Sequence, residues 1–166
     1  MRVAIYGRPI RTKDFKSFFS NFVQSLNNEN IKYEVVGSYN DFLKKEYSFI
    51  CPPCSLELNK SNYSCLISLG GDGTILDTLA LVKDSELPVM GINLGRLGFL
   101  ANIKMEEIDS AVRALGNNDF TIEARTFVEV VSKIKEIQDF PYALNDFVVQ
   151  KRDTSAMITV KAHLNG

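Results

Sequence analysis

A short apolar run meets a glycine-rich turn in the segment Cys65-Leu66-Ile67-Ser68-Leu69-Gly70-Gly71-Asp72-Gly73-Thr74, and this junction sets the architecture of the chain. Residues 65–69 are typical of a buried strand, and the apolar positions from 75 to 82 have helical spacing. A glycine turn between a strand and a helix can bind phosphate, because glycine allows a close backbone approach and the first helical amides point at the anion. An ordinary turn of this kind also favours glycine, so the glycines alone leave both interpretations open.

Strands and helices alternate on both sides of this junction. The sequence predicts strands at residues 2–6, 33–36 and 88–92, and helices at residues 15–26, 41–47 and 105–115. Thr12 is a candidate cap for the first helix, and Gly116-Asn117-Asn118 ends the last one. This alternation predicts an α/β domain over residues 1–118, with a Rossmann-like, mostly parallel sheet and helices on both faces.

The pattern changes in residues 119–166. Three β-rich runs follow one another, at residues 127–131, 147–149 and 157–160, and no helix is expected between them. Three or so strands have difficulty burying an apolar face of their own. We therefore interpret residues 119–166 as the beginning of an incomplete all-β domain, and we expect this part of the chain to recruit partners, aggregate or stay mobile.

Composition excludes several classes of protein. The 166 residues are 45% hydrophobic and 23% charged, as in ordinary globular proteins, with 19 basic and 20 acidic side chains and a formal net charge of −1. This balance gives no electrostatic reason to expect a nucleic acid or an anionic membrane as partner. No apolar run approaches the ~20 residues that span a bilayer, and the amino-terminal run is too short for a signal peptide. We expect a cytoplasmic protein.

The three cysteines do not suggest a disulfide framework. Cys51-Pro52-Pro53-Cys54 would need about two more ligands to hold zinc, and only Cys65 and the distant His163 are available. A thioredoxin-like pair should follow a strand and open a helix, whereas this pair lies in an irregular stretch. We therefore predict neither a redox centre nor a metal site built from side chains.

Asp72 is the strongest candidate for chemistry. A carboxylate among phosphate-facing amides repels the anion that it would meet, so its place there suggests that it holds a metal ion or accepts a proton from an attacking hydroxyl. The alternative is a helix cap, which is a common role for aspartate. Capping does not explain why glycine lies on both sides of Asp72. The functional interpretation is therefore favoured.

Three motifs resemble one family. The segment Gly70-Gly71-Asp72-Gly73-Thr74 resembles the signature of the superfamily that contains NAD kinases, diacylglycerol-type lipid kinases and, more distantly, phosphofructokinases. The second motif, Gly91-Ile92-Asn93-Leu94-Gly95-Arg96-Leu97-Gly98-Phe99-Leu100, is similar to the segment that follows the glycine turn in NAD kinases, where lipid kinases carry a Pro-Leu-Gly-Thr-type turn. The third, Ala143-Leu144-Asn145-Asp146-Phe147-Val148-Val149, resembles the Asn-Glu/Asp motif of NAD kinases. The resemblance covers residues 63–160.

The resemblance implies a reaction and roles for individual residues. It implies transfer of the γ-phosphoryl group of ATP to the 2′-hydroxyl of the adenosine ribose of NAD, with Mg²⁺ arriving on the nucleotide. Asp72 would be the catalytic residue that takes the hydroxyl proton. The implied nucleotide-binding residues are Gly70, Gly71, Asp72, Gly73, Thr74, Phe99, Asn145 and Asp146.

Simpler interpretations remain for four of these residues. Phe99 fits an apolar wall beside the dinucleotide or an ordinary core position. Asn145 and Asp146 suit ribose hydroxyls but also a turn before a strand. Thr74 is more readily explained as the start of the helix.

The family also suggests what lies beyond these motifs. NAD kinases continue into a second glycine-aspartate motif and a Thr-Gly-x-Thr-Ala-Tyr-like segment, and neither occurs in this sequence. The resemblance therefore implies an amino-terminal portion that makes little or no NADP alone and is a homo-oligomer when complete. Two alternatives stay open: a diacylglycerol-type lipid kinase, and a nucleotide-binding module without catalysis.

Overall fold

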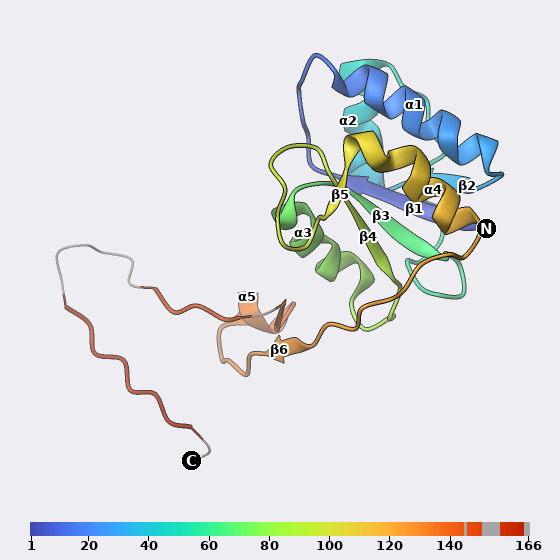
Figure 1. The fold of residues 1–166 in the computed structure, drawn as a ribbon. Helices are drawn as coiled ribbons and strands as arrows, with labels where there is room; N and C mark the ends of the chain where they lie inside the picture. The colour runs from blue at the N-terminus through green and yellow to red at the C-terminus, as the bar shows by residue number, and fades with distance from the viewer. Residues whose placement is uncertain (145, 151–156, 165–166) are drawn as a thin grey trace. The chain divides into compact units, whose positions relative to one another are not determined.

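The computed structural model describes residues 1–144, 146–150 and 157–164 (Figure 1). The chain divides into two compact units, Met1–Glu123 and Ala124–Gly166, and each is described by itself. The domain boundary predicted near residue 118 stays a prediction.

A five-stranded parallel sheet forms the centre of the first unit (Figure 1). Its strands lie in the order β2-β1-β3-β4-β5. They are β1 (Arg2–Gly7), β2 (Lys32–Val35), β3 (Cys65–Gly70), β4 (Val89–Asn93) and β5 (Ile103–Lys104). The chain runs outward from β1 to β2 in one direction and from β3 to β5 in the other, so the order reverses between β1 and β3. In open parallel sheets, ligands bind at the carboxyl ends of the strands beside such a reversal.

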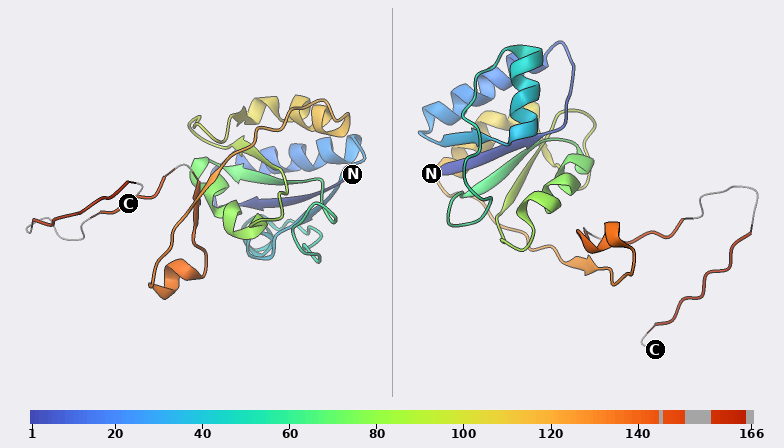
Figure 2. Two further views of the ribbon diagram at one scale, coloured as in Figure 1. Left: turned by 90° about the horizontal axis from the view of Figure 1, so that it is seen from below. Right: turned by 180° about the vertical axis from the view of Figure 1, so that it is seen from behind.

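Helices cover both faces of this sheet, as predicted. The helices are α1 (Phe15–Asn28), α2 (Gly37–Tyr47), α3 (Asp72–Val82) and α4 (Ile108–Gly116), the last preceded by a 3₁₀ turn, η1 (Met105–Glu107). Figure 2 shows α1 and α4 side by side on one face and α3 on the other. Val3 and Ile5 of β1 pack into the cluster of the first face, and Ala4 packs into the second. This alternation is the period of two that a strand imposes.

Strand β3 and helix α1 show why the sequence adopts this fold. All six residues of β3 are buried, as a central parallel strand with helices on both sides requires. In α1 the aromatic side chains recur at helical spacing and point into the core; the buried ones are Phe15, Phe18, Phe19 and Phe22. The predicted α/β architecture is confirmed.

Several predicted boundaries differ from the structure. Asp14, not Thr12, precedes the first residue of α1, and Thr12 contributes only its backbone carbonyl, which accepts a bond from the Phe15 amide. Helix α2 begins at Gly37 rather than at residue 41, because burial of the Tyr39 side chain draws an additional turn onto the core. Strand β5 was not predicted, since its two residues are too few for a periodic pattern.

The second unit carries a small antiparallel sheet. Strand β6 (Phe127–Glu129) pairs with β7 (Tyr142–Leu144), and a short helix, α5 (Lys135–Gln138), lies between them in the chain. The expectation of no helix in this region was therefore wrong. Residues 147–149 and 157–160 form no strand in the structure, because an apolar run becomes a strand only where a neighbouring strand pairs with it. The apolar side chains of both runs are exposed. Among the described residues, no helix is long and apolar enough to cross a membrane.

Candidate functional site

The glycine turn lies where the strand order reverses. Gly70 ends β3, Gly71 occupies the cap position of α3, and Asp72 is the first residue of that helix. Arg8 directly follows β1 on one side of the reversal, and Asn93 ends β4 on the other. The carboxyl ends of the neighbouring parallel strands β1, β3 and β4 (Figure 1) therefore place Arg8, the glycine turn and Asn93 at one edge of the sheet.

Two glycines of the turn have different surroundings. A Cβ on Gly70 would overlap the side chain of Thr74, so the turn closes only with glycine at this position. Thr74 is buried, and its amide donates to the carbonyl of Gly71 at 2.9 Å, which places Thr74 in the first turn of the helix. A Cβ on Gly71 would meet nothing within 4 Å, so the space that a side chain would occupy at this position is open. This is the side from which a phosphate can approach the turn.

Asp72 accepts three backbone hydrogen bonds from a distant segment. The amide of Phe99 donates to Oδ2 at 2.8 Å, and the amides of Leu100 and Ala101 both donate to Oδ1 at 2.9 Å. The Ala101 amide, followed by those of Phe99 and Leu100, holds the pKa of the Asp72 carboxyl below its usual value. The helix-cap interpretation of Asp72 is wrong, because Gly71 holds the cap position and the carboxylate binds another segment.

Residues 93–101, which we call the Asn93 segment, are held in place by two side chains. The side-chain amide of the buried Asn93 donates to the carbonyls of Arg96 (2.8 Å) and Ala101 (3.2 Å), and its oxygen accepts from the amide of Gly95 at 2.8 Å. Asp72 is the second of these side chains. A Cβ on Gly98 would overlap the Asp72 carboxylate, so only glycine lets the segment come this close. Sequence reasoning did not assign roles to Asn93 and Gly98, although an asparagine directly after a buried strand is a usable signal.

Phe99 has an unusual combination of exposure and restraint. Its side chain is 95% exposed, so the interpretation of Phe99 as a core residue is wrong. Its backbone amide is nevertheless fixed on Asp72. An exposed aromatic ring on a fixed backbone suits contact with a planar ligand group.

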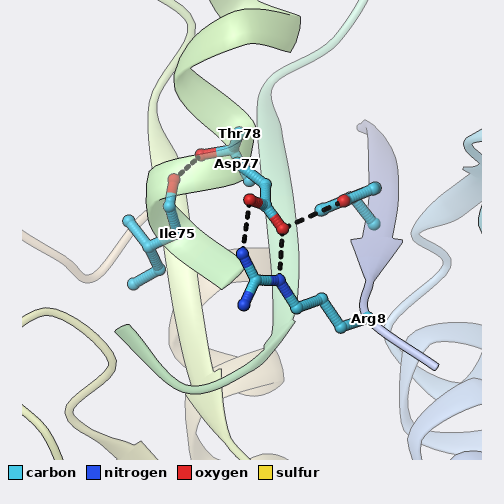
Figure 3. A network of polar contacts seen from close by, with 5 residues as sticks. Arg8, Ile75, Asp77 and Thr78 are labelled. Atoms are coloured by element: carbon cyan, nitrogen blue, oxygen red, sulfur yellow. Dashed lines mark hydrogen bonds and ion pairs between the residues drawn. The ribbon is translucent and has the colours of Figure 1, made fainter. Parts of the chain in front are cut away.

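A second polar group lies on the other side of the turn, and sequence reasoning missed it (Figure 3). Arg8 donates to both carboxylate oxygens of Asp77, from Nε to Oδ2 at 2.5 Å and from Nη2 to Oδ1 at 2.6 Å. The hydroxyl of Tyr6 donates to the same Oδ2 at 3.2 Å. Arg8 foremost, and then Tyr6, holds the pKa of the Asp77 carboxyl below its usual value. The position of Arg8 directly after a strand could have identified it as a candidate site residue.

The remaining predicted residues lie in the second unit or outside the described part. Asn145 lies outside the described residues. Asp146 is exposed, and its amide donates to the carbonyl of Leu144 at 3.1 Å. A ribose contact of either residue stays a prediction. Among the described residues, no group of three or more histidine, cysteine, aspartate or glutamate side chains forms a metal site, and Cys51, Cys54 and Cys65 are free thiols.

Known proteins resemble this chain over its whole length. Residues 20–120 match the model of the ATP-NAD kinase N-terminal domain. NAD kinase of Flavobacterium psychrophilum is 35% identical over 100% of this chain and 58% of its own length, and that of Flavobacterium johnsoniae is 36% identical over 99% and 58%. The chain thus spans somewhat more than half of these relatives.

A solved structure supports the fold. The crystal structure of yeast NADH kinase complexed with NADH superposes with a TM-score of 0.56 at 20% identity, covering 78% of this chain and 40% of the yeast chain. At this identity the likeness concerns the fold alone. Together, the family match and the bacterial relatives settle the classification: the chain belongs to the NAD kinase family.

Proposed function

We propose that this chain provides the phosphate-binding turn of an enzyme that transfers the γ-phosphoryl group of ATP to the 2′-hydroxyl of the adenosine ribose of NAD, making NADP. One observation carries the proposal: the ionised Asp72 is fixed by three amides beside the open space at Gly71. The relatives named NAD kinase support the reaction, and the family match leaves the lipid-kinase alternative without support.

The geometry of Asp72 supports a specific role. An ionised carboxylate offers about four lone-pair sites, and three of the four are taken by backbone amides. One site is left for a ribose hydroxyl. Because its pKa is lowered, Asp72 is ionised at neutral pH and is a weak base. We propose that it orients the hydroxyl first and takes the proton late, as the bond to the phosphoryl group forms.

The donor phosphates would lie against the glycine turn. Gly71 and Gly73 bring backbone amides toward the transferring phosphoryl group, and Gly70 and Thr74 hold the turn closed. The described residues do not form a side-chain cluster that suits Mg²⁺, and both Asp72 oxygens already accept amides. In our proposal the ion therefore enters with the phosphates of ATP, where it would neutralise their charge.

The proposal also covers the second unit and the location and assembly of the protein. Asn145 and Asp146 would bind ribose hydroxyls of NAD. The protein would act in the cytoplasm and assemble as a homo-oligomer, without nucleic acid or membrane as partner.

The test is to titrate ATP and NAD into the purified chain and to assay NADP formation in the same samples. We expect both nucleotides to bind and NADP to form slowly, at a rate that Asp72→Asn lowers by roughly 10²–10⁴, the usual effect of a positioned base. Binding of both nucleotides without any NADP would identify a non-catalytic binding module. A chain that binds neither nucleotide would contradict the proposal.

A further inference from the structure

Arg8 lies beside the glycine turn without being part of it. It is the first residue after β1, and the reversal of strand order places it next to the turn that follows β3. The three atoms nearest to a Cβ built on Gly73 all belong to the Arg8 guanidinium, with Nη1 at 3.0 Å. The guanidinium therefore lies over the first turn of α3.

The guanidinium uses two of its three nitrogens. Nε and Nη2 bind the carboxylate of Asp77, and Nη1 donates to no group in the part of the chain that the structure describes. In Figure 3 the third nitrogen points away from the Asp77 carboxylate. We infer that Arg8 binds a phosphate group of the nucleotide through this face. The inference rests on the proposed function and adds a residue to it.

Asp77 and Tyr6 hold the Arg8 side chain in the orientation that phosphate binding needs. The paired bonds to Asp77 fix the plane of the guanidinium, and Tyr6 fixes the carboxylate in turn. Because the side chain is already ordered, less conformational entropy is lost when a phosphate binds. Asp77 and Tyr6 are therefore positioning residues, and Arg8 is the one that contacts the ligand.

The loop that carries Arg8 is itself attached to α2. The hydroxyl of Tyr47 donates to the carbonyl of Ile10 at 2.8 Å. Arg11 donates to both carboxylate oxygens of Glu46, each at 3.0 Å. Arg11 thus has the same type of paired contact as Arg8, in the same loop, but with a partner on a different helix. It is a matched control.

Charge gives a second reason for a phosphate contact. Helix α3 carries two carboxylates, Asp72 and Asp77, in its first two turns, and both would repel a phosphate that approaches the turn. Backbone amides offset the first charge and Arg8 offsets the second. A purely structural ion pair would contribute little here, because the Arg8 side chain is 54% exposed and exposed pairs stabilise proteins only slightly.

The experiment compares wild type, Arg8→Gln, Arg8→Lys and Arg11→Gln in the full chain by calorimetric titration. The probes are ATP with Mg²⁺, NAD, inorganic triphosphate and adenosine, and thermal unfolding checks the fold. We expect Arg8→Gln to weaken a phosphate-bearing probe by about tenfold to a hundredfold, the usual effect of losing charge-assisted hydrogen bonds. Arg8→Lys should recover part of this affinity, since it keeps the charge without the fork. Arg11→Gln and adenosine binding should show no change.

The outcomes separate this inference from the proposed function. Weakening of ATP identifies the donor phosphates as the group that Arg8 binds, and weakening of NAD alone identifies the pyrophosphate of the acceptor. Equal affinity of wild type and Arg8→Gln for every probe overturns the inference while the proposed function stands. An equal loss for adenosine and ATP, or the same loss in Arg11→Gln, also overturns it, since a general structural change would then be the cause. If wild type binds neither ATP nor NAD, the proposed function fails and the Arg8 inference fails with it.

Discussion

At the scale of single residues, Asp72 combines a functional and a structural role. The sequence favoured a functional carboxylate because glycine lies on both sides of it. The structure adds that the carboxylate connects α3 to the Asn93 segment, through amides that lie 27 to 29 residues further along the chain. No short motif reveals this contact, because the three donors are backbone amides that any residue could supply.

The connection through Asp72 predicts a pH effect on stability. The pKa of Asp72 in the folded protein is below the ordinary value of 3.8. Its contribution to stability is therefore complete above pH 3.8 and is lost as the pH falls through the lower pKa of the folded state. Asp72→Asn should therefore lower the thermal midpoint by several degrees at pH 7, and the difference from wild type should shrink below about pH 4. Thermal unfolding between pH 2 and 7 measures this. Asp84→Asn, an exposed residue whose side chain makes no bond within the described residues, is the control. A difference that does not depend on pH would contradict the assignment.

Gly98 permits a second prediction. A methyl group at this position would overlap the Asp72 carboxylate and push the Asn93 segment away. Gly98→Ala should therefore destabilise the fold by about 1–3 kcal/mol, the usual cost of overpacking. Gly95→Ala lies in the same segment, and the nearest atom to its added Cβ is 4.0 Å away. Denaturant unfolding of both variants should show a loss for Gly98→Ala alone, and similar curves would remove the steric argument.

At the scale of elements, the strand–helix units could be predicted from the sequence because each carries its own periodicity. Strand β3 and helix α1 need no distant information to be recognised. Strand β5 and the β6–β7 pair form only where a neighbouring strand pairs with them. The apolar run at residues 147–149 therefore gave a wrong strand prediction, because it has no such partner among the described residues. The site divides in the same way: the glycine turn is local and was predicted, whereas the Arg8–Asp77 pair joins residues 69 positions apart.

The Asn93 segment gives a prediction at this scale. Removing the Asn93 side chain leaves one amide and two carbonyls of the segment without their partner. Asn93→Ala should cost about 1–3 kcal/mol of unfolding free energy and should speed amide exchange at Phe99 and Leu100. Asn102→Ala removes an exposed asparagine side chain that makes no bond in the described part of the chain. Exchange measured by NMR should change in the first variant only; unchanged exchange in both would show that Asp72 alone holds the segment.

At the scale of the whole molecule, the apolar core is distributed very unevenly. Of the buried hydrophobic side chains within the described residues, all except Leu144 belong to residues 1–123. The large exposed apolar side chains are common after residue 120, among them Phe127, Val131, Phe147 and Met157. The first unit therefore has the core that an independently folding domain needs.

A truncated chain tests this distribution. Residues 1–123 alone should unfold cooperatively, with a thermal midpoint close to that of the 166-residue chain. In the longer chain, hydrogen exchange should show strong protection at residues 66–69 and weak protection at residues 157–160. Leu66→Ala should lower the midpoint equally in both lengths, since it removes a buried side chain worth about 2–5 kcal/mol. Loss of cooperative unfolding in the shorter chain would show that the second unit is needed for the fold.

The restrained and exposed Phe99 also offers a spectroscopic handle. The chain contains no tryptophan, so Phe99→Trp would introduce a single indole whose backbone stays attached to Asp72. In the free protein this indole would emit as a solvated fluorophore, because the side chain at this position is 95% exposed. A nucleobase that stacks on it would quench the emission, and a burying contact would shift it to shorter wavelength. Its emission would then follow occupation of this edge of the sheet in real time, without a coupled assay or a labelled ligand.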